Sequence, residues 1–287
     1  MKLSREILHK VKQIEISTRR LLRGSLIGEH RSSRKGSGLE FDQIREYQIG
    51  DDIRFIDWKT SARLGTLSVK EYIEERNRTI MLLVDVSAST LYGSGDLLKS
   101  EVIAQIASVF AVIAESAKDY CGAIFFNDDI VKIIPPAQGR MHTHRMMEEF
   151  FSVKPHGKTN FTKAFNKLLS LQKKDTMVFV LSDFLEQGSY ETALRIAAKH
   201  HDVIAVQCID LQEEHLTFNG QLLFEDPELG TQLTIDGTDN LYKELCHKKM
   251  ENIHTLLNAS GVDILKIETG QDFVGNIIRF FRKRMRA

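Results

Sequence analysis

The sequence predicts an α/β fold: a doubly wound, mostly parallel sheet with a smaller N-terminal helix and a β-rich segment. The apolar runs at residues 80–84 and 177–181, and the largely apolar segment 203–209, are typical of strands buried on both faces. Segments with helical spacing of apolar residues separate these runs, and this alternation predicts parallel strands joined by right-handed crossovers. We therefore expect an N-terminal segment over residues 1–76 and an α/β domain over residues 77–287.

Composition narrows the class of protein. The 287 residues carry 39 basic and 39 acidic side chains, and a net charge of zero argues against a globally basic nucleic-acid binder. Cys121, Cys208 and Cys246 lack metal-ligand spacing, so we expect free thiols, buried at Cys121 and Cys208, in a reducing compartment. No apolar run reaches the roughly 18 residues that span a bilayer, and the N-terminus lacks the apolar core of a signal peptide. We expect a cytoplasmic protein without a transmembrane segment.

The first expected element is an amphipathic helix over residues 3–22 with one basic face. Its apolar positions are Leu3, Ile7, Val11 and Ile14. Docking of this apolar face on the body of the protein is the favoured arrangement, and binding to a membrane surface is the alternative. Residues 23–38 are rich in Gly, Ser and Arg and predict a mobile loop.

A dense polar and aromatic block follows over residues 40–59, with a turn at residues 50–52 and a short strand expected over residues 66–72. One interpretation is a recognition surface. The favoured interpretation is a salt-bridged mini-core centred on Trp58, because opposite charges this close usually pair. The possible interaction surface comprises Arg45, Asp51, Asp52, Arg54, Asp57, Trp58 and Arg63.

Helices and strands alternate in the remainder of the chain. Further strands are expected over residues 121–126, 130–134 and 262–267, and hairpins within residues 215–236. Helices are expected over residues 97–117, 142–151, 161–171, 190–199, 242–257 and 273–284. Pro135 and Pro136 are expected to end a strand, because proline cannot donate to a ladder. Thr159 or Asn160 is expected to cap the helix that follows. The pairs His142/His144 and His200/His201 are expected to face solvent.

Oxygen-bearing side chains lie at or beside the ends of the expected strands. The candidate metal ligands are Asp85, Ser87, Ser89, Thr159 and Asp183. Ligands of open α/β sheets bind at the carboxyl ends of the strands, and hydroxyl and carboxylate oxygens suit Mg²⁺ or Mn²⁺. We expect the serines to bind the ion directly, Thr159 directly or through water, and one position to stay open for a partner's carboxylate. The alternative is that these side chains only cap helices and form turns.

Two resemblances sharpen this interpretation. The segments Asp85-Val86-Ser87-Ala88-Ser89, Gly157-Lys158-Thr159 and Ser182-Asp183 resemble the metal-ion-dependent adhesion site (MIDAS) of von Willebrand factor A domains. The block Arg45-x-Tyr47-x-x-Gly50-Asp51-Asp52-x-Arg54-x-Ile56-Asp57-Trp58-Lys59 resembles the bacterial domain-of-unknown-function-58 (DUF58) family. This resemblance covers nearly the whole chain. It implies a von Willebrand factor A-like protein that acts with a MoxR-type AAA+ ATPase in the assembly or maturation of other proteins.

The leading hypothesis for function is a metal-dependent protein-interaction module, not an enzyme, because the sequence shows no catalytic constellation. A partner would supply a Glu or Asp carboxylate to the ion. The first alternative is a Mg²⁺-dependent phosphoester hydrolase with Asp85 as nucleophile. Ser87 stands where a haloacid-dehalogenase-type phosphatase needs a second Asp, and phosphate-loop and nucleophile-elbow motifs are missing. The second alternative is binding of nucleic acid or anionic membranes through the basic N-terminal helix.

Overall fold

The computed structural model describes residues 35–73, 78–172, 175–186, 190–214, 221–225, 232–236, 240–271 and 273–284. The chain divides into two compact units, which we describe separately. The small unit is Ile27–Asn77, and the large unit contains Arg78–Ala287. The helix expected over residues 3–22 lies outside the described residues.

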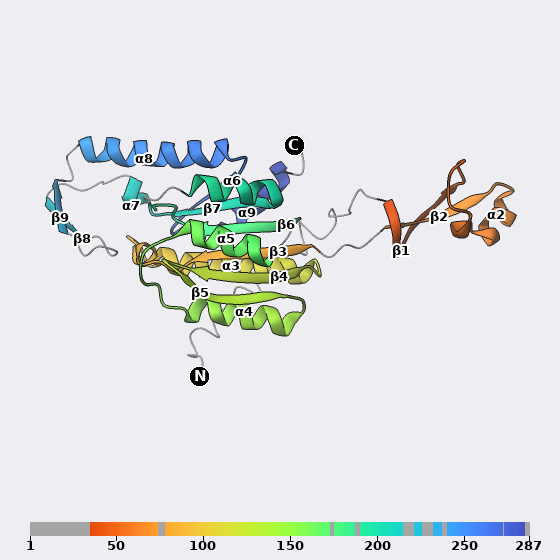
Figure 1. Cartoon of the computed structure of the whole chain (residues 1–287), viewed down its shortest axis with the longest axis horizontal. Coiled ribbons are helices and arrows are strands. Elements are labelled where there is room, and N and C mark those ends of the chain that lie inside the picture. Colours follow the sequence, from red (N-terminus) through yellow and green to blue (C-terminus); the bar gives the residue numbers. More distant parts are fainter. Residues whose placement is uncertain are drawn as a thin grey trace. The chain divides into compact units, whose positions relative to one another are not determined.

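The small unit contains an antiparallel strand pair, β1 (Lys35–Glu46) with β2 (Ser68–Ile73) (Figure 1). The expectation of a loop through residue 38 is wrong, because residues 35–38 belong to β1. Lys35 and Glu40 both align with Ile73 of β2, and the Gly- and Ser-rich residues lie in the irregularity of register between them. The 3₁₀ helix η1 (Ile53–Phe55) and the helix α2 (Trp58–Leu64) lie between the two strands in the sequence.

Helix α2 has clear start and stop signals. The carboxylate of Asp57 accepts hydrogen bonds from the backbone N–H groups of Lys59 and Thr60, both at 3.1 Å. Gly65 ends the helix at a φ of 74°, which a glycine adopts without steric cost. Ser61 points inward, and its hydroxyl donates to the Asp57 carbonyl and accepts from the Ser68 N–H.

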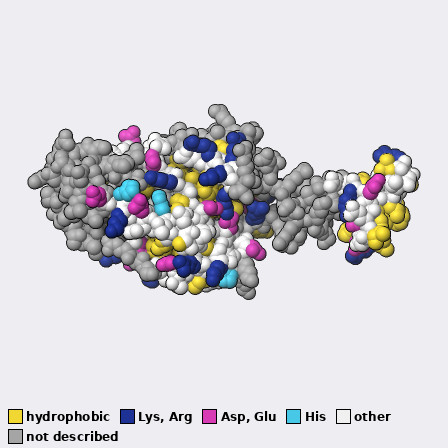
Figure 2. All heavy atoms as spheres, turned by 90° about the horizontal axis from the view of Figure 1, so that it is seen from above, with side chains coloured by type: hydrophobic (Ala, Val, Ile, Leu, Met, Phe, Trp, Pro, Cys, Tyr) yellow, Lys and Arg dark blue, Asp and Glu magenta, His cyan; other side chains and the backbone are white. Residues whose placement is uncertain are grey.

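Trp58 is not the centre of a mini-core in the small unit. Its side chain is 68% exposed, so this part of the sequence-based interpretation is wrong. The physical reason is that α2 turns Ser61, not the indole, toward β2. Figure 2 shows hydrophobic side chains gathered on the small unit. Among the residues of this unit whose side chains the structure describes, the exposed large apolar ones are Ile44, Ile49, Ile53, Trp58, Leu64 and Leu67.

Six described strands of the large unit form one sheet in the order β10-β7-β6-β3-β4-β5. They are β3 (Thr79–Asp85), β4 (Tyr120–Phe126), β5 (Ile130–Ala137), β6 (Thr176–Ser182), β7 (Asp202–Ile209) and β10 (Asp263–Glu268). Neighbours are parallel except for β5, which pairs antiparallel with β4. The chain first builds the sheet outward from β3 through β4 to β5, and then from β6 through β7 to β10. The predicted doubly wound, mostly parallel sheet is therefore confirmed, with its switch point between β3 and β6.

Helices cover both faces of this sheet (Figure 1). One face packs against α3 (Lys99–Ser116), α4 (Arg140–Ser152) and α9 (Phe273–Arg284). The other face packs against α5 (Phe161–Leu171), α6 (Glu191–His200) and α8 (Asn240–Ala259). Along β3, Leu82 and Val84 enter the first core and Met81 and Leu83 enter the second. Burial on both sides explains the uninterrupted apolar run.

Most boundaries in the large unit lie within two residues of those expected, and β5 is an exception. Pro135 and Pro136 do not end β5, which continues to Ala137. As an edge strand, β5 tolerates prolines because it has no partner on one side. His201 is buried whereas His200 is exposed, so the expectation that both face solvent is wrong for His201. Cys121 and Cys208 are buried free thiols, as expected.

A hairpin of β8 (Gln221–Glu225) and β9 (Gln232–Asp236) lies within the region where hairpins were expected. The short helices η2 (Ala88–Leu91) and α7 (Leu211–Glu214) follow the carboxyl ends of β3 and β7. The part of the large unit that the structure describes contains no helix long and apolar enough to cross a bilayer.

Candidate metal centre

Asp85 lies at the carboxyl end of β3, the strand at the switch point, and its side chain is buried. One carboxylate oxygen, Oδ1, accepts the backbone N–H of Ser87 at 2.9 Å. The other oxygen, Oδ2, accepts the hydroxyl of Ser182 at 2.5 Å and lies 3.5 Å from the donating hydroxyl of Thr159. Three segments far apart in the sequence therefore meet at one carboxylate.

Ser87 and Ser89 present a pair of hydroxyl oxygens beside Asp85, separated by 3.0 Å. Two adjacent ligands in an octahedral Mg²⁺ shell with bonds of about 2.0–2.1 Å lie about 2.9 Å apart, so this spacing fits the ion. The strand-end loop is fixed to the segment that carries Thr159 by two backbone hydrogen bonds. The Ala88 N–H donates to the Gly157 carbonyl at 2.9 Å, and the His156 N–H donates to the Val86 carbonyl at 2.8 Å.

Gly157 is required by the geometry of this second loop. Its φ is 74°, and a Cβ at this position would lie 2.7 Å from Oδ1 of Asp128. Asn160, rather than Thr159, caps α5 by accepting the Lys163 N–H at 3.0 Å. The Thr159 hydroxyl therefore remains directed at Asp85 instead of at the helix.

Asp183, the last of the five candidate metal ligands, is buried and forms an ion pair with the side chain of Lys99. Its Oδ2 accepts a hydrogen bond from Nζ of Lys99 at 2.8 Å, and its Oδ1 accepts the Leu185 N–H at 3.2 Å. Lys99 also donates to Oε1 of Glu213 at 2.8 Å. The side chain of Lys99 is 0% exposed, and Asp183 and Glu213 are its two ion-pair partners.

Neither Lys99 nor Glu213 was identified from the sequence. One signal was available for the lysine, because a cation in the first turn of a helix opposes the helix dipole and needs a compensating partner.

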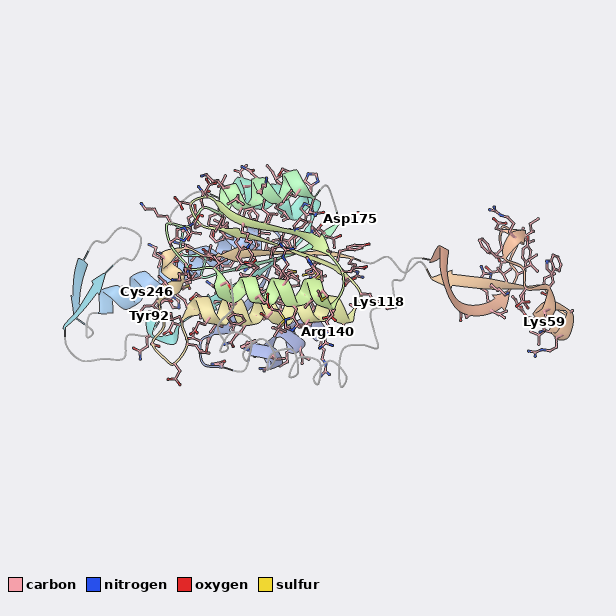
Figure 3. All side chains as sticks on the ribbon, turned by 90° about the horizontal axis from the view of Figure 1, so that it is seen from below. Lys59, Tyr92, Lys118, Arg140, Asp175 and Cys246 are labelled. Carbon is pink, nitrogen blue, oxygen red and sulfur yellow. The ribbon has the colours of Figure 1, made fainter. Side chains whose placement is uncertain are left out.

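Figure 3 labels Tyr92, at the opposite end of the large unit from Lys118 and Asp175. The ring centroid of Tyr92 lies 5.7 Å from Nζ of Lys99.

The electrostatics of the site favour an added cation. Burial raises the pKa of Asp85 to about 7, and the negative charge of Asp183 acts in the same direction, while hydrogen bonds from Ser182 and Ser87 partly oppose both. Burial acts to lower the pKa of Lys99, but Asp183 and Glu213 outweigh it and hold that pKa above its ordinary value. Burial also raises the pKa of Glu213. A divalent cation would relieve the repulsion between Asp85 and Asp183.

Asp210 fixes the neighbouring loops but has no free oxygen for a ligand. It accepts the N–H and hydroxyl of Ser94 at 2.9 and 2.6 Å, the hydroxyl of Thr269 at 2.7 Å and the N–H of Gln212 at 2.9 Å. Burial alone would raise its pKa, yet these hydrogen bonds, those from Ser94 first, hold the pKa below its ordinary value. Asp210 is therefore a structural clamp at the carboxyl edge of the sheet.

Within the described ranges, three or more His, Cys, Asp or Glu side chains never gather in a group that could hold a metal ion. The candidate centre therefore depends on hydroxyl ligands, and Ser87, Ser89 and Thr159 supply these. The chemistry of this set, three hydroxyls with two carboxylates nearby, fits a hard divalent cation such as Mg²⁺ or Mn²⁺.

The charged residues of the possible interaction surface largely pair with each other. Arg45 binds Asp51 through two hydrogen bonds of 2.7 Å, which, with the Gln48 N–H, lower the pKa of Asp51 to about 2. Arg54 contacts Asp52 at 2.6 Å. Asp57 caps α2, and its Oδ2 lies 3.5 Å from Nζ of Lys70. Arg63 and Trp58 are exposed.

Comparisons with known proteins identify the family. The model of the family described as "Protein of unknown function DUF58" matches residues 43–254, more than half of the chain. The chain belongs to the DUF58 family. Its relatives include the uncharacterized protein Rv1480 of Mycobacterium tuberculosis, 26% identical over 284 residues that cover 96% of this chain and 89% of that protein.

Solved structures similar to this DUF58 protein include the conserved hypothetical protein BatB of Bacteroides thetaiotaomicron. That structure is 13% identical, has a TM-score of 0.47, and is matched over 74% of this chain and 100% of its own. The von Willebrand factor A domain of SpRpn10 is 12% identical, with a TM-score of 0.41, over 70% of this chain and 94% of its own. The large unit of this DUF58 protein has the doubly wound, mostly parallel α/β architecture that its sequence predicts, with one antiparallel edge strand.

Proposed function

We propose that this DUF58 protein is a metal-dependent protein-interaction module that binds Mg²⁺ or Mn²⁺ at the carboxyl edge of its sheet. The observation that carries this proposal is the convergence of three loops on Asp85, with the Ser87 and Ser89 hydroxyls 3.0 Å apart. Ser87, Ser89 and Thr159 would hold the ion directly, while Asp85 and Asp183 would bind its water ligands. The bound ion would supply the positive charge that receives a carboxylate oxygen of a partner protein.

The residues of this chain would orient that contact rather than take part in a reaction. The backbone bonds between the loops fix the serines before an ion enters, which lowers the entropy lost on binding. Following the family resemblance, the partner we propose is a MoxR-type AAA+ ATPase in the cytoplasm, offering a Glu or Asp side chain. The task of the pair would be assembly or maturation of other proteins.

Thermal unfolding tests whether an ion binds at this position. Mg²⁺ or Mn²⁺ at about 100 times its Kd would stabilise the protein by roughly 2.7 kcal/mol, which raises the melting temperature. The rise should disappear in Asp85→Ala and shrink in Ser87→Ala. Ser170→Ala is a matched control, because its hydroxyl is exposed and bonds only within α5. Equal melting curves of the wild type with metal and with chelator would contradict the proposal.

A pull-down tests the partner. The wild-type protein, the Asp85→Ala variant and the Ser170→Ala control would each be incubated with a purified MoxR-type ATPase in Mg²⁺ and in chelator. The proposal expects retention of the ATPase by the wild type and the control in Mg²⁺ alone. Retention that is the same in chelator, or in Asp85→Ala, would show that any contact does not use the metal site.

A further inference from the structure

Lys99 is a fully buried lysine placed between the candidate metal ligands and a neighbouring segment. Its Nζ lies 2.8 Å from Oδ2 of Asp183 and 2.8 Å from Oε1 of Glu213. Asp183 follows β6, whereas Glu213 lies on α7 after β7. One ammonium group therefore bridges two loops at the carboxyl edge, and it replaces the solvent that would otherwise neutralise both carboxylates.

The bridge limits what Asp183 can do for an ion. Both of its oxygens already accept hydrogen bonds, one from Lys99 and one from the Leu185 N–H. Each oxygen keeps a further lone pair, but direct coordination by Asp183 would place the metal ion on the same carboxylate as the ammonium of Lys99. The ammonium of Lys99 also repels a divalent cation placed beside Asp183.

We propose that Lys99 is a positioning residue that sets the metal affinity of the site and makes it depend on Glu213. Lys99 holds Asp183 in the outer shell of the ion, and Glu213 neutralises part of the lysine's charge. This inference rests on the proposed function, since it concerns the same ion. It adds Glu213 of α7 as a determinant of metal affinity, besides the five residues that the motif supplies.

Glu213 is suited to this role because it is the more accessible partner of Lys99. Its side chain is 20% exposed, against 1% for Asp183. Its second oxygen, Oε2, accepts the Asp210 N–H at 3.4 Å, next to the clamp described above. A partner or a movement that displaced Glu213 would leave Lys99 paired to Asp183 alone, and the site would bind metal less tightly.

The test is a set of Mn²⁺ titrations of the full chain by isothermal titration calorimetry at one pH. Lys99→Met removes the opposing charge and releases Asp183, so Mn²⁺ should bind on the order of tenfold or more tightly than to the wild type. Glu213→Gln leaves the lysine less compensated and should weaken binding by a similar factor. Lys99→Arg keeps the charge and should stay within about threefold of the wild type, since it preserves the opposing cation.

A matched control and a double variant separate this role from a structural one. Lys158→Met removes an exposed cation adjacent in sequence to Thr159, where solvent and salt screen the charge, and should leave the affinity nearly unchanged. Lys99→Met leaves two buried carboxylates unpaired and could fail to fold. In that event Lys99→Met/Glu213→Gln, which removes both charges, decides: it should bind Mn²⁺ more tightly than Glu213→Gln alone.

The outcomes are distinguishable. Opposite effects of Lys99→Met and Glu213→Gln on Mn²⁺ affinity support the inference, because a purely structural loss would weaken binding in both. If the wild type binds Mn²⁺ and Lys99→Met binds it no more tightly, the role of Lys99 is overturned while the metal site stands. The same holds if the double variant binds Mn²⁺ no more tightly than Glu213→Gln. Absence of Mn²⁺ binding in the wild type and in every variant overturns the proposed function together with this inference.

Discussion

Asp85 should make the metal-free protein less stable as the pH rises toward 7. The folded-state pKa of Asp85 is about 7, chiefly because the carboxyl is buried and secondly because Asp183 is close. An unfolded Asp has a pKa of about 3.9. Between these values the folded state keeps a proton that the unfolded state has released, so the free energy of unfolding falls as the pH rises. The stabilisation is fully present below about pH 4 and is lost by the time the pH passes about 7.

The size of this effect follows from the two pKa values. A difference of about three pKa units corresponds to roughly 4 kcal/mol, at about 1.4 kcal/mol for each unit. Asp85→Asn removes the ionisable group while keeping most of the shape of the side chain. In chelator, the variant should therefore lose less stability than the wild type between about pH 4 and about pH 8, by up to this amount.

Urea denaturation of both proteins at several pH values measures this difference directly. Subtracting the Asp85→Asn curve removes the contribution of histidines and other groups that titrate over the same range. Saturating Mg²⁺ should reduce the loss in the wild type, because the ion stabilises the ionised carboxylate. If the wild type and Asp85→Asn lost the same stability across this pH range, the reasoning about the buried carboxylate would be refuted.

Three further predictions test other parts of the structure. Neither ring nitrogen of His201 has a hydrogen-bond partner within the described residues, and burial, followed by the charge of His200, lowers the pKa of its ring. The free energy of unfolding should therefore fall as the pH drops below about 6.5. In denaturant titrations, His201→Phe should reduce that loss. Ser94→Ala removes the hydroxyl that donates to the buried Asp210 at 2.6 Å and should destabilise the protein by about 1–3 kcal/mol in urea; an unchanged midpoint would show that Asp210 is not a clamp. Trp58→Ala should change stability by no more than about 0.5 kcal/mol, because the indole is exposed; a loss above about 2 kcal/mol would show that the indole is buried in solution.

Much of the large unit could be predicted from the sequence because its signals are local. The apolar run of β3 shows that both of its faces are buried, and the periodicity of residues 161–171 and 273–284 sets both ends of α5 and α9. The small unit was harder. The Gly- and Ser-rich residues 36–38 lie in β1 between Lys35 and Glu40, which both align with Ile73 of β2, and that pairing brings together residues far apart in the sequence.

The candidate site shows the same division between local and distant signals. Asp85, Ser87 and Ser89 are close in sequence at a strand end, so their proximity could be expected from the topology. Lys99 could not be identified in this way. Its partners lie 84 and 114 residues further along the chain, and a lysine becomes a buried ion-pair residue only when both carboxylates are in place.

Crystals grown with Mn²⁺ would test the central claim most directly, because anomalous scattering locates the ion. The account predicts one strong anomalous peak for an Mn²⁺ ion bonded to the hydroxyl oxygens of Ser87 and Ser89, at about 2.0–2.2 Å from each. It further predicts that Asp183 remains hydrogen-bonded to Lys99 while this ion is present. A fully loaded crystal with no peak beside the two serines, or with its peak elsewhere on the chain, would contradict the account.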